Sequence, residues 1–158
     1  MADLAARINR AYAVAEADLW LPGTERIGPD RVREIVAEGE LAVARVHGQI
    51  VGSVRVRRLE PQVGFFGLLA VEPSEQGLGI GGELIRYAER SMRDAGAQEM
   101  ELRLLVPRGH TDPWKKHLHV WYSRLGYRQI GRREFDRPDS IAAARTPLDI
   151  LTYRKPLA

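Results

Sequence analysis

A glycine-dense segment near the middle of the chain is the feature best suited to chemistry. The apolar run Leu68-Leu69-Ala70-Val71 stops at Glu72-Pro73, and the glycine segment that follows is Gln76-Gly77-Leu78-Gly79-Ile80-Gly81-Gly82. A helix-like segment from Glu83 to Ala95 comes next. Glycines let a backbone approach a ligand closely and adopt positive φ, and the first amides of a helix have no acceptor within it. This order predicts a site for a ligand with several phosphates.

Other interpretations of the loop differ in what they require of the rest of the chain. The spacing Gly77-x-Gly79-x-x-Gly82 matches the dinucleotide fingerprint, but that fold needs repeated parallel βαβ units, and the upstream segments indicate an antiparallel meander. A mononucleotide P-loop needs Lys followed by Ser or Thr, and neither follows the glycines. A plain glycine-rich surface turn remains open when the loop is considered alone.

Two motifs with a fixed separation point to one family. Gln76 to Gly81 fits an Arg/Gln-x-x-Gly-x-Gly/Ala acyl-CoA motif, and the Leu-Ala-Val-Glu-Pro before it is similar to a strand and its exit. Trp121 to Tyr127 fits a Tyr-x-x-x-Gly-Phe/Tyr helix end. One helix, one strand and a second helix separate the motifs. Over roughly residues 39–156 the chain therefore resembles the GNAT superfamily of acyl-CoA-dependent N-acetyltransferases.

The resemblance implies acetyl-CoA as the co-substrate. Its pantetheine chain would pair with the backbone of Leu69 and Val71 like an added strand, and one of these amides would polarise the thioester carbonyl. Tyr122 would protonate the departing sulfur, because a phenol with a reference pKa of about 10 stays protonated at neutral pH. Simple core packing remains the alternative role for Tyr122. The implied cofactor-binding residues are Leu69, Val71, Gln76, Gly77, Leu78, Gly79, Ile80, Gly81 and Gly82.

No general base is evident in the sequence. Many family members have a Glu in the strand before the glycine loop, whereas Glu72 stands at the exit of this strand, where a solvated turn residue is usual. His117 falls one turn before Trp121 and could face the site, and His119 is expected to point outward. Lys115 stands where the family often has an Asn. With Lys116, it would meet cofactor phosphates or merely solvate the helix.

The implied activity is acetylation of a primary amine on a small molecule or peptide. Transfer would be direct, within a ternary complex, because the chain has no cysteine to carry an acyl group. Two alternatives stay open. One is a non-enzymatic acyl-CoA-binding module, favoured by the missing base. The other is transfer of a bulkier acyl group, with Phe65, Phe66 and Trp121 lining its pocket. Homodimers are common in the family and are a further option.

Composition describes an ordinary globular chain. Its 158 residues are 44% hydrophobic and 28% charged, and we expect one domain over residues 1–158. No apolar run approaches the roughly 20 residues that span a bilayer, and with the absent signal peptide and cysteines this suits the cytoplasm. A net charge of +3 with scattered basic clusters disfavours a nucleic-acid partner. The histidines lack a metal-ligand pattern, so we expect no metal.

Hydrophobic periodicity predicts a mixed α+β fold with a mostly antiparallel central sheet flanked by helices, and the resemblance implies that this fold is of the GNAT type. One parallel strand pair is expected on either side of the helix that follows the glycine loop. That helix should turn Leu84 and Ala88 inward and Glu89 outward. Family members usually begin with a strand, whereas this chain starts almost at once with a helix. The expected helices are 4–19, 30–38, 83–95 and 112–125, the expected strands are 41–46, 50–56, 63–71, 99–106, 127–135 and 148–153, and the long loop 138–147 is expected to serve packing or the site.

Overall fold

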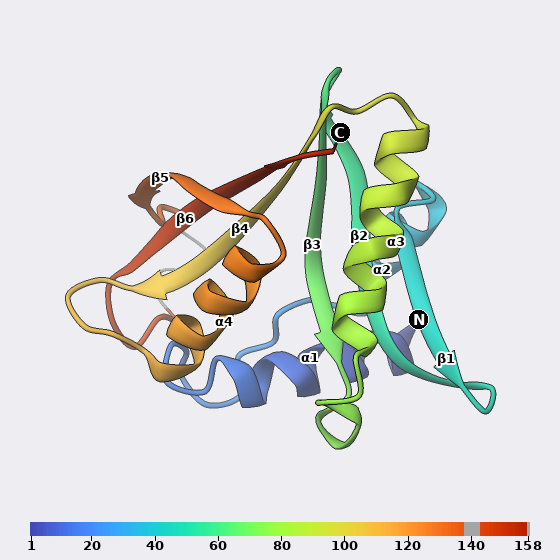
Figure 1. Ribbon diagram of the computed structural model, residues 1–158. Coiled ribbons are helices and arrows are strands. Elements are labelled where there is room, and N and C mark those ends of the chain that lie inside the picture. Colours follow the sequence, from blue (N-terminus) through green and yellow to red (C-terminus); the bar gives the residue numbers. More distant parts are fainter. Residues whose placement is uncertain (138–142, 158) are drawn as a thin grey trace.

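The structure is a computed structural model, and it describes residues 1–137 and 143–157 (Figure 1). Part of the loop 138–147, for which a packing or site role was predicted, therefore lies outside the described residues. The helices are α1 (Ala2–Ala15), α2 (Pro29–Ala37), the short 3-10 helix η1 (Pro73–Glu75), α3 (Ile80–Asp94) and α4 (Pro113–Arg124). The strands are β1 (Leu41–Val46), β2 (Gln49–Glu60), β3 (Val63–Val71), β4 (Glu99–Pro107), β5 (Arg128–Glu134) and β6 (Leu148–Pro156).

The six strands form one sheet in the order β1-β2-β3-β4-β6-β5. All neighbouring pairs are antiparallel except β3 and β4, which are parallel and are joined by the crossover through α3. The predicted mixed, mostly antiparallel fold with one parallel pair is thus confirmed. Among residues 1–137 and 143–157 no strand precedes α1, and β1 and β5 are the edge strands.

Helices cover both faces of the sheet, α3 and α4 on one and α1 and α2 on the other (Figure 1). On the first face Leu84 and Ala88 of α3 pack with Val56, Phe66 and Leu102 of the strands. A second, smaller cluster joins α1 and α2 to the far end of β3. Since side chains alternate along a strand, residues next to the first cluster, such as Arg57 beside Val56, face the α1/α2 side.

The parallel strands β3 and β4 stay together for only part of their length. They pair from Val63 with Glu99 to Phe65 with Glu101, and beyond this point they diverge. The sheet therefore opens into a wedge that widens toward the glycine loop, as Figure 1 shows between β3 and β4. The wedge leaves strand backbone of β3 without a β4 partner next to the predicted phosphate loop.

A β-bulge in β3 lies on the edge of this wedge. Ser53 pairs with Ala70 and Arg55 with Gly67, so both Leu68 and Leu69 oppose the single residue between Ser53 and Arg55. Leu68 has φ 49°, which is sparsely populated for a residue with a side chain and costs of order 1–3 kcal/mol. The extra residue reverses the alternation, because Leu69 packs against the α3 side whereas Leu68 packs against α1.

Two expectations about the helices need correction. Helix α3 begins at Ile80, three residues before the predicted Glu83, because Gly79 with φ 83° provides its N-cap and the helix includes Gly81 and Gly82. Glu89 was expected to face outward, and this is wrong: it is buried and accepts a hydrogen bond from the Tyr127 hydroxyl at 2.6 Å. No described helix is long and apolar enough to cross a membrane.

Candidate active site

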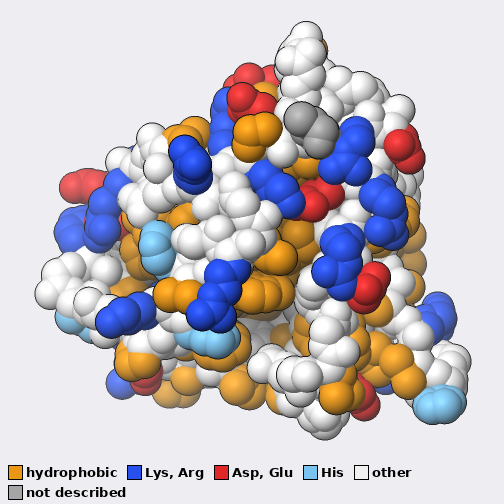
Figure 2. Space-filling view, in the orientation of Figure 1, with side chains coloured by type: hydrophobic (Ala, Val, Ile, Leu, Met, Phe, Trp, Pro, Cys, Tyr) orange, Lys and Arg blue, Asp and Glu red, His pale blue; other side chains and the backbone are white. Residues whose placement is uncertain are grey.

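A cavity of about 830 Å³ runs through the wedge between β3 and β4. One end is bounded by the glycine loop and the start of α3, and the other by α1, the loop before α2 and the face of the sheet beneath them. Helix α4 forms a side wall with Trp121 and Tyr122. In Figure 2 apolar side chains lie in the hollow between α4 and α3, with Lys and Arg side chains around them.

The glycine loop presents a set of helix-start amides to this cavity. Gly77 and Gly79 both have φ 83°, a conformation that a residue with a side chain rarely adopts. The first intrahelical bond runs from the Glu83 amide to the Gly79 carbonyl at 3.1 Å, so the amides before Glu83 have no acceptor in the helix. Gly79 has no side chain to cap them. They stand at the positive end of the helix dipole, an arrangement that suits an anion.

Nearly all the predicted cofactor-binding residues line the cavity together. The exception is Leu78, whose side chain is exposed at the outer tip of the loop. The two sequence motifs also meet here, because a Cβ added to Gly81 would lie 3.1 Å from the Trp121 ring. A side chain at position 81 would therefore press on the Trp121 ring, which would have to shift to make room. The predicted site residues that line the cavity are Leu69, Val71, Gln76, Gly77, Gly79, Ile80, Gly81, Gly82 and Tyr122.

Tyr122 both packs in the core and borders the cavity. Its ring centroid lies 6.3 Å from those of Phe66, Tyr127 and Tyr153. The residue is 6% exposed. Burial, with the phenols of Tyr12 and Tyr153 nearby, raises the pKa of Tyr122. The phenol is therefore protonated across the neutral range and can act as a donor. The two roles weighed for Tyr122 are thus compatible.

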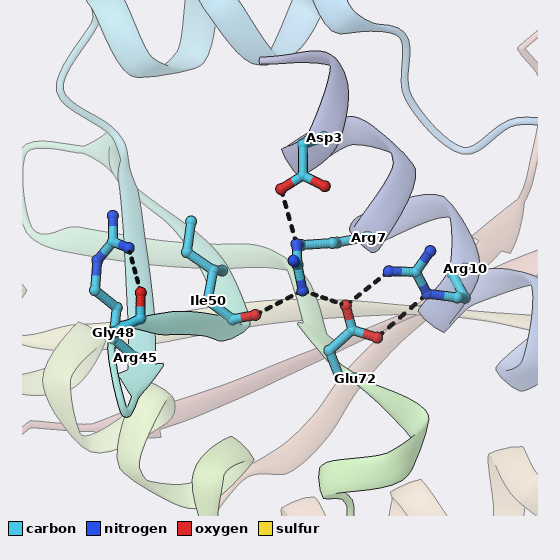
Figure 3. A network of polar contacts seen from close by, with 7 residues as sticks. All are labelled: Asp3, Arg7, Arg10, Arg45, Gly48, Ile50 and Glu72. Atoms are coloured by element: carbon cyan, nitrogen blue, oxygen red, sulfur yellow. Dashed lines mark hydrogen bonds and ion pairs between the residues drawn. The ribbon is translucent and has the colours of Figure 1, made fainter.

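Glu72 is held in a network of polar contacts with α1 (Figure 3). It is not among the residues that line the cavity. Its carboxylate accepts from Arg10 at 2.9 Å and from Arg7 at 3.0 Å, so it ties α1 to the end of β3. The hydrogen bond from Arg10, with the charge of both guanidiniums, lowers the pKa of Glu72. A carboxylate so engaged is a weak base, and Glu72 is not the solvated turn residue that its position in the sequence predicts.

The first turn of α4 also differs from expectation. Asp112 caps the helix, accepting from the Lys115 amide at 3.0 Å. Lys115 itself neither solvates the helix nor stands free for phosphate, because its ammonium contacts the Glu16 carboxylate at 2.7 Å and both side chains are at most 7% exposed. Burial alone would raise the pKa of Glu16, but the Lys115 and Arg26 charges hold it below its usual value.

The two histidines take different places. His117 lines the cavity, as its position one turn before Trp121 predicts, and stacks on Trp114 with centroids 5.2 Å apart. His119 is exposed as expected, yet its Nδ1 lies 2.7 Å from the Tyr153 hydroxyl. Across residues 1–137 and 143–157, no group of three or more potential metal ligands comes together.

Three features of the site were missed at the level of sequence, and two left a signal. Glu16 follows Ile8 and Tyr12 at intervals of four, so a carboxylate stands on the apolar stripe of α1 and calls for a buried partner. Arg55 and Arg57 alternate with core valines, which places both on the opposite face of one strand. The residue with positive φ at the bulge is Leu68 and not a glycine, so Gly67 directly before it did not mark the strained position.

The comparisons with known proteins agree with this geometry. Residues 37–129 match the family described as the acetyltransferase (GNAT) domain. Comparison with curated protein sequences finds none that matches. Among solved structures, an aminoglycoside 6'-N-acetyltransferase complexed with coenzyme A superposes with a TM-score of 0.68 at 16% identity, covering 99% of this chain and 92% of that one. A ribosomal-protein-alanine N-acetyltransferase from Brucella melitensis gives 0.68 at 18% identity, covering 98% and 92%.

A third similar structure, the aminoglycoside 6'-N-acetyltransferase from Enterococcus faecium, gives a TM-score of 0.67 at 16% identity over 99% of this chain and 92% of that one. These likenesses establish the fold, and the family match covers more than half of the chain. The chain belongs to the GNAT family and is an acetyltransferase of that family. These three structures name two different kinds of acceptor, aminoglycosides and an alanine of a ribosomal protein, so they do not define the acceptor here.

Proposed function

We propose that this protein transfers an acetyl group from acetyl-CoA to the nitrogen of a primary amine on a small molecule or peptide, by direct transfer in a ternary complex. One observation carries the proposal. A single cavity brings together the amides between Gly79 and Gly82, the bulge at Leu68 and Leu69, and the phenol of Tyr122.

Each of these groups has a defined task in the proposed reaction. The helix-start amides bind the pyrophosphate of the cofactor. The backbone of Leu69 and Val71, which has no β4 partner beyond Phe65, pairs with the pantetheine chain. A backbone amide at the bulge donates to the thioester carbonyl oxygen and stabilises the negative charge that develops there. The strained backbone at Leu68 is then part of the site rather than a defect.

The chemical step forms one bond and breaks one. The nitrogen lone pair attacks the carbonyl carbon, the C–N bond forms, and the C–S bond breaks as the carbonyl returns. Tyr122 donates its proton to the leaving thiolate of coenzyme A. The attacking nitrogen releases one proton, and water carries it back to Tyr122. Glu16 lines the cavity with a lowered pKa and an ammonium partner, so it is a poor base. We infer that the amine loses its proton to water before attack.

The test is turnover with a panel of primary amines. Purified protein with acetyl-CoA and each amine should release free coenzyme A thiol, measured by a thiol reagent, and mass spectrometry should show the matching N-acetylated product. Longer acyl-CoA thioesters should react more slowly, because Phe66 is packed between Tyr122 and Tyr127 and cannot swing aside. Stabilisation by coenzyme A without turnover on any amine would leave only a binding protein.

A further inference from the structure

The wall of the cavity opposite α3 carries an aromatic ring flanked by two arginines. Phe65 is the direct cross-strand partner of Arg57, and the Arg57 guanidinium carbon lies 5.1 Å from the Phe65 ring centroid. The Arg103 guanidinium carbon, from β4, lies 5.3 Å from the same centroid. All three side chains line the cavity. This cluster, Arg57, Phe65 and Arg103, is here called the arginine–phenylalanine cluster.

The cluster lies on the side of the sheet away from the phosphate loop. Val56, Phe66 and Leu102, which neighbour its members along their strands, pack under α3 and α4. Strand alternation therefore places the cluster on the α1/α2 face. The helix-start amides that suit the pyrophosphate belong to α3, on the opposite face. The charge of the cluster is thus not needed for the cofactor phosphates and serves whatever enters from the α1/α2 side.

The position of the cluster along the wedge relates it to the thioester. Phe65 is the last residue of β3 that pairs with β4, and its ring lies over Gly67, where an added Cβ would be 2.9 Å from the ring. The bulge at Leu68 and Leu69 begins at the next residue. A molecule held against Phe65 therefore stands beside the amide proposed to hold the thioester carbonyl.

Within the described part of the chain, the Arg57 guanidinium has no carboxylate partner, and its Nε is buried without a hydrogen-bond acceptor. Its neighbours on the same face are paired. Arg55 contacts Glu40 at 2.5 Å, and Arg103 contacts Glu101 through Nε at 2.9 Å. A buried, charged group without an acceptor is costly, so the guanidinium of Arg57, whose side chain lines the cavity, is suited to bind a negatively charged ligand there.

The wider cavity has the same sign of charge. Among the described residues, nine arginines and lysines line it, against three acidic residues. Five of the nine contact a carboxylate, namely Arg31, Arg55, Arg86, Arg103 and Lys115, so the excess of positive charge rests on the other four, which include Arg57. Such a wall would repel an amine that carries several positive charges and would attract one that also bears a negative group. A guanidinium presents paired donors in a planar fork that matches an oxyanion such as a carboxylate.

We propose that the acceptor is a small primary amine that also carries an oxyanion, most simply a carboxylate, which Arg57 binds together with the outer edge of Arg103. This inference rests on the proposed transfer function and narrows its acceptor to amino-acid-like amines. Phe65 packs against the carbon chain between the two ends. The amine then points along β3 toward the bulge, where the acetyl group is delivered.

The first test compares acids with neutral partners of the same shape. Glycine, β-alanine and γ-aminobutyrate are assayed against their carboxamides, with aminomethylphosphonate as a second oxyanion. At least one acid should exceed its carboxamide in kcat/KM by about tenfold or more, because the acid gains hydrogen bonds to a charged donor. The phosphonate arm shows whether the site prefers a planar carboxylate or accepts a tetrahedral oxyanion.

The second test removes the guanidinium. Arg57→Gln should raise KM for the preferred acid by about ten- to one-hundredfold and leave KM for its carboxamide and for acetyl-CoA within about twofold. Arg57→Lys keeps the charge but loses the planar fork of donors, so its KM for the acid should lie between those of the parent protein and Arg57→Gln. Arg45→Gln is the matched control, because Arg45 is an exposed arginine of β1 whose one side-chain hydrogen bond to a described residue is with the Gly48 carbonyl of its hairpin. It should behave as the parent protein does.

Each outcome decides the proposal. Equal rates for acids and carboxamides, or an Arg57→Gln variant that weakens acetyl-CoA instead, would overturn the oxyanion site while leaving the transferase function intact. If no amine is acetylated, calorimetry with coenzyme A-saturated protein still applies. Binding of an acid but not its carboxamide, lost in Arg57→Gln, would support the site although the proposed function had failed, and equal binding of both would overturn it.

Discussion

Replacing Lys115 with methionine is expected to destabilise the protein strongly. Lys115 and Glu16 come from α4 and α1, lie 2.7 Å apart, and are 7% and 4% exposed, so the pair belongs to the buried class of salt bridges. Lys115→Met removes the ammonium and leaves the Glu16 carboxylate buried. Among the described residues, its remaining hydrogen-bond donor is the Trp20 indole. Losing one partner of a buried pair costs about 3–5 kcal/mol, or about 6–20 °C in Tm for a protein of this size.

The assay is equilibrium unfolding in urea at pH 7, with two companion variants. The double variant Glu16→Gln/Lys115→Met removes the stranded charge and should regain about 2 kcal/mol or more over the single variant. Arg33→Met is the control. It breaks a surface pair with Asp30 whose side chains are 63% and 91% exposed, and such pairs are worth about 0–1 kcal/mol.

The pH dependence checks the same reasoning. Because the folded pKa of Glu16 lies below its ordinary value of 4.5, the stability from this carboxylate is present above that pH and is lost as pH falls through the folded pKa. The gap between the parent protein and Lys115→Met should therefore narrow in acid. A cost for Lys115→Met no larger than that for Arg33→Met, or no recovery in the double variant, would refute the buried-pair argument.

Four further outcomes are expected. Tyr122→Phe should lower kcat by about one hundredfold or more while the Kd for coenzyme A, measured by calorimetry, stays within about twofold; an unchanged kcat would remove Tyr122 as the acid. Gly79→Asp should weaken coenzyme A binding at least about tenfold more than Gly79→Asn, because both tolerate φ 83° but only Asp sets a negative charge against phosphate. The pH at which kcat/KM levels off should follow the pKa of the acceptor amine across a series, and an inflection fixed at one pH would instead indicate a protein base such as His117. Glu72→Gln should reduce stability at pH 7 and change it less in acid, since the lowered pKa of Glu72 makes its contribution fade as pH falls, and a difference independent of pH would contradict the network in Figure 3.

The features that could be predicted from sequence are those set by short stretches of chain. The glycines at 77 and 79 and the inward stripe of α3 with Leu84 and Ala88 act within one or two turns, so their patterns predicted the turn and the helix that the structure shows. Motif spacing then fixed the family. Even here the start of α3 was placed three residues late, because its glycines are poor helix formers by propensity.

Only the tertiary structure could show the contacts between residues that lie far apart in the chain. Glu16 and Lys115 are separated by 99 residues, and Glu89 is turned inward by Tyr127 and Lys155, 38 and 66 residues away. The bulge at Leu68 depends on how β3 must register with β2, and the arginine–phenylalanine cluster forms only because three strands lie side by side. Sequence periodicity specifies the face on which a charge lies, whereas its partner depends on which elements the sheet brings into contact.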